Sequence, residues 1–191
     1  MKPSDKRVDI MQAALELISE KGFHGAPMAE LAEKAGVSAG TIYLYFDSKE
    51  SLITELHQEL ENKIMTTVQE DYPFDSPLRE RFLFLINKLV HHFINNPLHF
   101  RYMEQFFNSP FGASIHRDKL LNNTGNQKLL FDIFEQGVEQ KVIKELPKFM
   151  LFSLAIGPLL ILIRDHTLGF VTLDDLLIEQ FTESCWDAIK R

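Results

Sequence analysis

The sequence predicts an all-α protein made of two helical parts. Apolar residues recur at helical spacing along almost the whole chain, and Gly, Pro and helix-capping residues separate one apolar stripe from the next. No alternation of apolar and polar residues is long enough to indicate a strand, and no internal repeat is present. Short helices fill the first 50 residues and longer helices fill the remainder, so we expect domains at 1–50 and 51–191.

The first predicted helix is amphipathic and ends at Gly22. Ser4 is a suitable N-cap for this helix, because its hydroxyl can accept a hydrogen bond from a backbone N–H of the first turn. The apolar stripe of the helix consists of Val8, Met11, Leu15 and Ile18.

Two short helices follow within the first 50 residues. Pro27 suits the first position of a helix that Gly36 stops. Ser38 can cap the next helix, in which Ile42 and Phe46 share one face. These three N-terminal helices are all short, as expected for a small helical domain.

A long helix begins after the run Asp47–Glu50, which resembles a capping box with either Asp47 or Ser48 as the cap, and extends to about residue 70. The stretch 112–125 stays open between helix and loop, since the run 122–125 (NNTG) favours a break. We expect the remaining helices at about 77–95, 97–108, 126–141, 147–166 and 173–190.

The composition is that of an ordinary globular protein, with 45% hydrophobic and 25% charged residues among 191. The single cysteine, Cys185, excludes an intrachain disulfide. The N-terminus lacks the apolar segment of a secretory signal, and the longest apolar run, 149–163, is shorter than the roughly 20 residues that span a bilayer. These features predict a cytoplasmic protein that does not enter a membrane.

The net charge of -7 argues against a protein coated with basic patches. Residues 1–50 hold six Lys and Arg against eight Asp and Glu, and residues 51–191 hold 14 against 19. Neither part is basic. Binding to nucleic acid must therefore rest on local geometry and not on bulk charge.

The segment 29–52 carries the strongest functional signal. A helix, a tight turn at 36–38 and a second short helix form a helix-turn-helix over 27–46. If Ile42 and Phe46 face inward, a rotation of about 100° per residue places the following residues on the outward face or at its edges: Ala39, Gly40, Thr41, Tyr43, Leu44 and Tyr45. This uncharged face is typical of a helix that enters the DNA major groove, where methyl groups contact thymine and Tyr hydroxyls reach phosphates.

Six short motifs stand at fixed spacing in the same region: Gly22-Phe23, Met28-Ala29-Glu30-Leu31-Ala32, Ala35-Gly36-Val37-Ser38, Gly40-Thr41-Ile42-Tyr43, Tyr45-Phe46 and Lys49-Glu50-Ser51-Leu52. Together they closely resemble the tetracycline-repressor (TetR) family over about residues 4–60. The resemblance implies an N-terminal three-helix DNA-binding domain, joined by a long helix to a C-terminal helical domain that binds an effector and dimerises. Most members of the family are repressors.

The resemblance also assigns DNA contacts position by position. It makes Ser38 the cap of the recognition helix and Lys49 a phosphate contact. The family usually has Thr or Ser at the positions of Ala26 and Pro27, and Ala26 cannot supply a hydroxyl. The full set of expected DNA-binding residues is Pro27, Met28, Ser38, Ala39, Gly40, Thr41, Tyr43, Leu44, Tyr45 and Lys49.

For the C-terminal domain we expect an effector site walled by aromatic side chains, which suits a hydrophobic or amphipathic molecule. Its expected lining is His92, Phe93, Tyr102, Phe106, Phe131, Phe134 and Phe152, with Glu104 and Gln105 as further polar candidates. In the family, such a ligand shifts the long helix that follows the recognition helix.

We also expect a homodimer, because one recognition helix per chain offers too little contact and two chains can read a palindromic operator. By resemblance, the interface lies on the last two helices. Its expected residues are Phe152, Ile156, Leu159, Ile163, Leu177, Phe181 and Cys185.

The sequence therefore predicts a transcriptional repressor that a hydrophobic small molecule releases from double-stranded operator DNA. The alternative is a DNA-binding protein of the same fold whose C-terminal domain docks a protein partner and has no small-molecule effector. An enzyme, a metal site or a cofactor is not expected, because no His, Cys and carboxylate set has an accepted ligand spacing.

Overall fold

The computed structural model describes residues 5–110, 112, 113, 115 and 128–191. These residues form nine α-helices and, apart from an isolated antiparallel bridge between Ile143 and Lys190, no strand. The predicted all-α class is confirmed. Ser4 and most of the stretch 112–125 lie outside the described residues.

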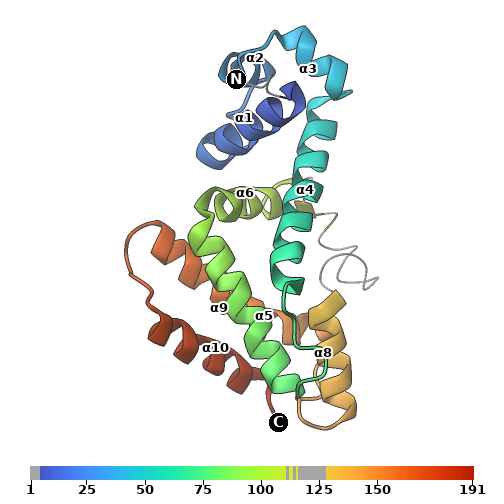
Figure 1. Cartoon of the computed structure of the whole chain (residues 1–191), viewed down its shortest axis with the longest axis vertical. Helices are drawn as coiled ribbons and strands as arrows, with labels where there is room; N and C mark the ends of the chain where they lie inside the picture. Colours follow the sequence, from blue (N-terminus) through green and yellow to red (C-terminus); the bar gives the residue numbers. More distant parts are fainter. Residues whose placement is uncertain (1–4, 111, 114, 116–127) are drawn as a thin grey trace. The chain divides into compact units, whose positions relative to one another are not determined.

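The chain divides into two compact units. Unit 1 comprises residues 1–63 and 98–115, and unit 2 comprises residues 64–97 and 116–191. The long helix α4 (Lys49–Gln69) therefore contributes its first part to unit 1 and its end to unit 2. Figure 1 shows the helices along the chain, from α1 in blue to α10 in red.

Unit 1 contains α1 (Lys6–Lys21), α2 (Met28–Lys34), α3 (Ala39–Tyr45), the first part of α4, and α6 (Pro97–Phe107). Their boundaries follow from local capping. Asp5 is the N-cap of α1 and accepts from the backbone N–H of Arg7. Gly22 ends that helix with a φ of 71°, a left-handed conformation that Gly adopts without strain. Of the two predicted caps of α4, Ser48 is the one that accepts a backbone N–H, from Ser51 (3.1 Å).

The core of unit 1 includes α6 as well as the three N-terminal helices. Ser19 on α1 donates its hydroxyl to the carbonyl of Leu98 (3.0 Å). Tyr102 on α6 is fully buried and donates its hydroxyl to the carbonyl of Ile53 on α4 (2.8 Å). Burial raises the pKa of Tyr102, because the phenolate would lose its hydration. These two bonds tie α6 to both α1 and α4.

Unit 2 is built around α5 (Leu78–Asn95). This helix packs against α8 (Lys128–Glu139), α9 (Lys148–Thr167) and α10 (Asp175–Ile189). Large apolar side chains fill the space between them, and the rings of Phe82 and Trp186 lie 5.4 Å apart. Gly137 lets the chain after α8 fold back closely, since a Cβ there would stand 2.4 Å from Cδ1 of Ile143.

The helix α9 is the one described helix that is long and apolar enough to cross a membrane, by length and composition alone. Its 20 residues exceed the apolar run of the sequence because the helix continues past both ends of that run. One of its faces is buried in unit 2, where Leu151, Ala155, Leu159 and Ile163 are each at most 1% exposed. The helix as a whole is only partly buried, because other apolar side chains such as Phe149 and Ile161 are exposed.

We predict that Tyr102→Phe lowers the free energy of unfolding by about 1 kcal/mol, because it removes a buried hydrogen bond while preserving the ring. Urea unfolding measures this change. Tyr45→Phe serves as the matched control, since the Tyr45 side chain is 42% exposed, and should leave the stability unchanged. Equal stabilities of the two variants would show that the bond to Ile53 contributes nothing.

Candidate DNA-binding surface

The recognition helix α3 has one buried face and one exposed face. Ile42 and Phe46 are at most 1% exposed, so they anchor α3 to the rest of unit 1. Tyr43 is 53% exposed, Leu44 83% and Tyr45 42%. Ala39 and Gly40 are exposed, and Thr41 is half-buried. Every side chain that the sequence placed on the outward face is therefore accessible, except that Thr41 is partly covered.

The turn before α3 is held by its own backbone and by the cap. Gly36 takes a φ of 65°, which permits the sharp reversal between α2 and α3. The hydroxyl of Ser38 accepts from the backbone N–H of Thr41 (3.1 Å) and shares a 2.8 Å hydrogen bond with the Thr41 hydroxyl. The predicted cap is confirmed, and Thr41 presents its methyl group with its hydroxyl already engaged.

At the start of α2 the two expected contact residues differ in exposure. Pro27 is the N-cap residue and is exposed, whereas Met28 is half-buried. Ala26, directly before them, is fully buried. A hydroxyl at this position would be buried and would need a hydrogen-bond partner. A small apolar residue has no such requirement.

Arg7 packs against Phe46 at the C-terminal end of α3, a contact that the sequence did not predict. Its guanidinium lies over the ring of Phe46, 5.5 Å from the centroid, and donates to Glu55 on α4 (2.8 Å). A second carboxylate, that of Glu59, lies 3.6 Å away. The hydrogen bond that Arg7 donates to Glu55 is the main reason why the pKa of Arg7 is raised. The partners stand about 40 to 50 positions apart in sequence, so no local pattern could have revealed them.

Lys49 was expected to contact a phosphate, and the structure gives its ammonium a partner within the chain. Nζ donates to the backbone carbonyl of Phe23 at 2.6 Å. Burial lowers the pKa of Lys49, because the ammonium is partly desolvated. An ammonium has three donors, so Lys49 retains donors for a phosphate while it holds the α1–α2 connection against the start of α4.

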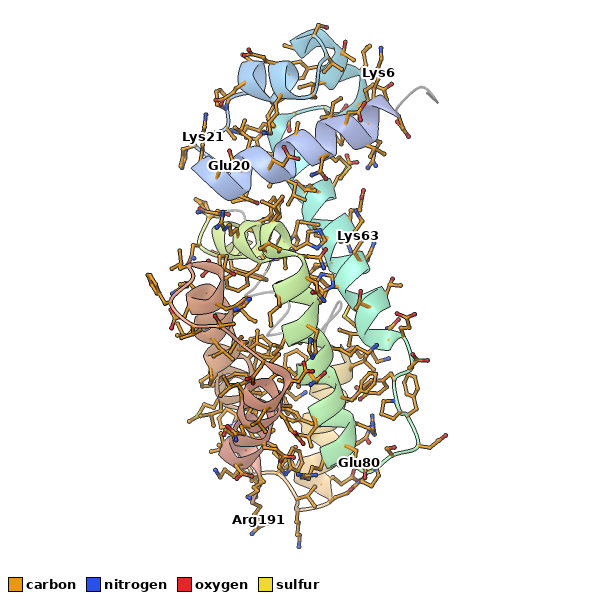
Figure 2. The ribbon with its side chains drawn as sticks, turned by 60° about the vertical axis from the view of Figure 1, so that its left-hand side comes forward. Lys6, Glu20, Lys21, Lys63, Glu80 and Arg191 are labelled. Atoms are coloured by element: carbon orange, nitrogen blue, oxygen red, sulfur yellow. The ribbon has the colours of Figure 1, made fainter. Side chains whose placement is uncertain are left out.

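The recognition helix α3 contains no charged residue, and two lysines on α1 and α2 are paired. Lys34 pairs with Glu16 at 2.9 Å, and Lys21 pairs with Glu30. Figure 2 shows Lys6 and Lys21 at the two ends of α1. The groups that α3 itself can offer to DNA are therefore hydroxyls, methyl groups and backbone N–H groups, and not charged side chains.

The residues expected to line an effector site are almost all buried, but in two different units. Tyr102 and Phe106 belong to unit 1; His92, Phe93, Phe131, Phe134 and Phe152 belong to unit 2. Phe152 is half-buried, and its ring lies 6.1 Å from that of Phe131. Burial lowers the pKa of His92. Gln105 is exposed, so its expected inward orientation is wrong.

One buried polar residue was not selected from the sequence. His57 on α4 is 2% exposed, and neither of its ring nitrogens has a hydrogen-bond partner. A histidine in an otherwise apolar helical stripe is usually a core residue, so only the structure reveals that its nitrogens are unsatisfied. Among the described residues, no group of three or more His, Cys, Asp and Glu side chains could hold a metal ion.

The expected dimer residues divide into two groups. Leu159, Ile163 and Cys185 are at most 2% exposed inside unit 2, so their expected place on an outer face is wrong. Burial also raises the pKa of the Cys185 thiol to about 11. Leu177 is exposed, whereas the remaining three are half-buried: Phe152, Ile156 and Phe181. Helical spacing identified an apolar stripe on each helix but could not distinguish the stripe that meets α5 from the one that faces outward.

Two family models match the chain. One, described as bacterial regulatory proteins of the tetR family, matches residues 10–56. The other, described as the tetracyclin repressor-like C-terminal domain, matches residues 77–190, which is more than half of the chain. Together the two matches cover the helix-turn-helix and nearly all of the larger helical part.

Individual proteins show the same similarity. A putative transcriptional regulator of the TetR family from Vibrio parahaemolyticus has a solved structure that is 34% identical, with a TM-score of 0.76, over 98% of this chain and 100% of that one. The fatty acid metabolism regulator protein of Bacillus subtilis is 35% identical over 83 residues, 44% of this chain and 43% of that protein. The chain thus spans less than half the length of that regulator.

A likeness in fold extends further. The transcriptional regulator FadR from Bacillus subtilis, solved in complex with stearoyl-CoA, is 20% identical with a TM-score of 0.73, over 94% of this chain and 95% of that one. The motifs of the helix-turn-helix, the arrangement of the helices and the two family models agree. The chain belongs to the TetR family of DNA-binding transcriptional regulators, a family of regulators and not of enzymes.

Proposed function

We propose that this protein is a homodimeric repressor that binds a palindromic operator and is released by an amphipathic small molecule. The observation that carries the proposal is the exposed, uncharged face of α3, which has no other evident role. A repressor of this kind acts in the cytoplasm, where the operator is. The DNA contact, the dimer and the effector rest on separate observations.

For DNA, the exposed groups on α3 suit direct contacts in the major groove. Leu44 and the methyl of Ala39 can meet a thymine methyl, and the hydroxyls of Tyr43 and Tyr45 can reach phosphates. Gly40 allows a close approach of the helix backbone to the DNA. Because so few cations are available, the affinity should depend only modestly on salt for each subunit.

For dimerisation, the support comes from exposed apolar side chains on α9 and α10. They are Phe149, Met150, Leu154, Leu160, Ile161, Leu176 and Leu177, each at least 37% exposed. Exposed apolar side chains concentrated on two neighbouring helices favour an interface. A second copy of the chain is the occupant that a two-fold symmetric operator requires, since it brings a second α3.

For the effector, we propose a long-chain acyl compound. The chain resembles a fatty acid metabolism regulator over 83 residues, and a protein of the same fold has been solved with stearoyl-CoA. Buried aromatic side chains of unit 1, such as Tyr102 and Phe106, fit an apolar ligand of this class. The alternative, a C-terminal domain that docks a protein partner, predicts that no such ligand affects DNA binding.

We predict that Tyr43→Phe weakens operator binding by about 2- to 10-fold on all sequences alike, because it removes one hydrogen bond to a phosphate. Leu44→Ala should instead change the preferred base at one position of each half-site, by about 1–3 kcal/mol. Fluorescence anisotropy with a randomised set of operators measures both effects. Phe74→Ala is the matched control, because Phe74 is an aromatic that is 62% exposed in unit 2. Full affinity and unchanged preference in both α3 variants would contradict the assignment.

We predict that Ile161→Glu combined with Leu177→Glu converts a dimer into a monomer, because two charges per chain would be buried at the interface. Sedimentation equilibrium at micromolar concentration measures the change. Val142→Glu, at an apolar residue that is 42% exposed outside these helices, is the control and should remain dimeric. A monomeric unmodified protein would contradict the proposed interface.

We predict that a long-chain acyl-CoA weakens operator binding by a factor of about 5 to 150, the usual range of coupling between two sites. Operator DNA must then weaken binding of the same acyl-CoA by the same factor, which a paired calorimetric titration checks. CoA without an acyl chain is the control. If acyl-CoA binds and the affinity for DNA stays constant, the release mechanism is wrong.

A further inference from the structure

The histidine on α4 that lacks partners lies in a defined aromatic environment within unit 1. The His57 ring stacks on the ring of Phe106, with centroids 3.7 Å apart and planes 9° apart. Phe107 approaches the same imidazole edge-on, at 6.0 Å. Both phenylalanines belong to α6, so the imidazole is held between α4 and α6.

Both nitrogens of this imidazole are buried without a hydrogen bond, although one has a charged neighbour. An unsatisfied buried polar group lowers stability, and a Leu would fill the same volume without that cost. Oε1 of Glu61 lies 3.4 Å from Nε2, close enough for charge attraction but without hydrogen-bond geometry. Nδ1 has no hydrogen-bond partner among the described residues. A ligand that brings an acceptor to Nδ1 would satisfy it.

We propose that His57 is the polar anchor of the effector and that Nδ1 donates a hydrogen bond to the carbonyl oxygen of an acyl thioester or ester. This inference rests on the proposed release by an acyl compound and assigns the recognition of its head group. The acyl chain next to that carbonyl would lie against the rings of Phe106 and Phe107.

The charges favour a neutral acceptor over a free carboxylate. The Glu61 carboxylate lies on the Nε2 side of the ring, so Nδ1–H is the donor that faces the ligand. A thioester or ester carbonyl accepts this bond and adds no charge to the buried site. A fatty acid carboxylate would add a second negative charge next to Glu61, which costs free energy in a site of low polarity.

The same site lies next to the contacts that hold the helix-turn-helix. Phe106, whose ring covers His57, also contacts the ring of Phe23 at 6.2 Å. The carbonyl of Phe23 accepts the hydrogen bond from Lys49, at the start of α4. A ligand at Nδ1 would lie beside the ring of Phe106, which contacts Phe23, and Phe23 in turn contacts Lys49. Binding at His57 thus favours one arrangement of these side chains over another, as release from DNA requires.

The test compares two ligands that differ only in the carbonyl: palmitoyl-CoA, a thioester, and S-hexadecyl-CoA, the corresponding thioether. The full-length protein should bind the thioester about 10- to 100-fold more tightly, because the thioether leaves the buried Nδ1 without an acceptor. His57→Phe keeps the ring that stacks on Phe106 and lacks both nitrogens, so it should bind the two ligands equally. His57→Leu provides the same comparison if the Phe variant does not fold. His24→Leu, at an exposed histidine of the same unit, should keep the preference.

The possible outcomes separate this inference from the proposed function. A preference for the thioester that persists in both His57 variants overturns the anchor but leaves an acyl effector in place. Equal binding of thioester and thioether by the unmodified protein also overturns the anchor. If neither ligand binds or changes the affinity for DNA, the acyl effector is wrong and the anchor falls with it.

Discussion

The packing of Phe23 against Tyr102 and Phe106 is the interaction on which unit 1 depends. Phe23 comes from the connection after α1, and its ring meets the two α6 rings edge-on at 5.9 and 6.2 Å. Aromatic pairs of this geometry each contribute about 0.5–1.5 kcal/mol beyond the area they bury. The backbone carbonyl of the same residue accepts the hydrogen bond from Lys49. One residue therefore joins α6, the α1–α2 connection and the start of α4.

Recognition by this protein depends on shape and placement more than on charge. The chain carries a net charge of -7, and Arg7, Lys21 and Lys34 on α1 and α2 are paired with carboxylates. What unit 1 offers instead is a rigidly held helix, because Ile42 and Phe46 are buried beneath α3 and Arg7 covers the ring of Phe46. A fixed helix loses little conformational freedom on binding, which preserves more of the contact energy for affinity.

Local features of the structure could be predicted from the sequence, and features that join distant segments could not. The Ser38 cap, the end of α1 at Gly22 and the exposed face of α3 all follow from neighbouring residues, because a helix has a fixed rotation per residue. The bond between Lys49 and Phe23 and the stack of His57 on Phe106 join positions 26 and 49 residues apart. For the same reason spacing alone misplaced Leu159, Ile163 and Cys185, since it identifies a stripe without naming the helix that covers it.

In this mechanism α3 binds the operator, and the aromatic cluster of Phe23, Tyr102 and Phe106 in unit 1 responds to the effector. The four tyrosines of the chain can report on both events. Tyr43 and Tyr45 lie on α3, Tyr102 lies in the cluster, and Tyr72 lies in unit 2. Fluorine NMR of the fluorotyrosine-labelled protein measures all four at once. The account predicts that operator DNA shifts the Tyr43 and Tyr45 resonances but not that of Tyr72, and that palmitoyl-CoA shifts the Tyr102 resonance and restores the first two to their free positions. Tyr43 and Tyr45 resonances that stay unchanged while the protein is bound to its operator would contradict it.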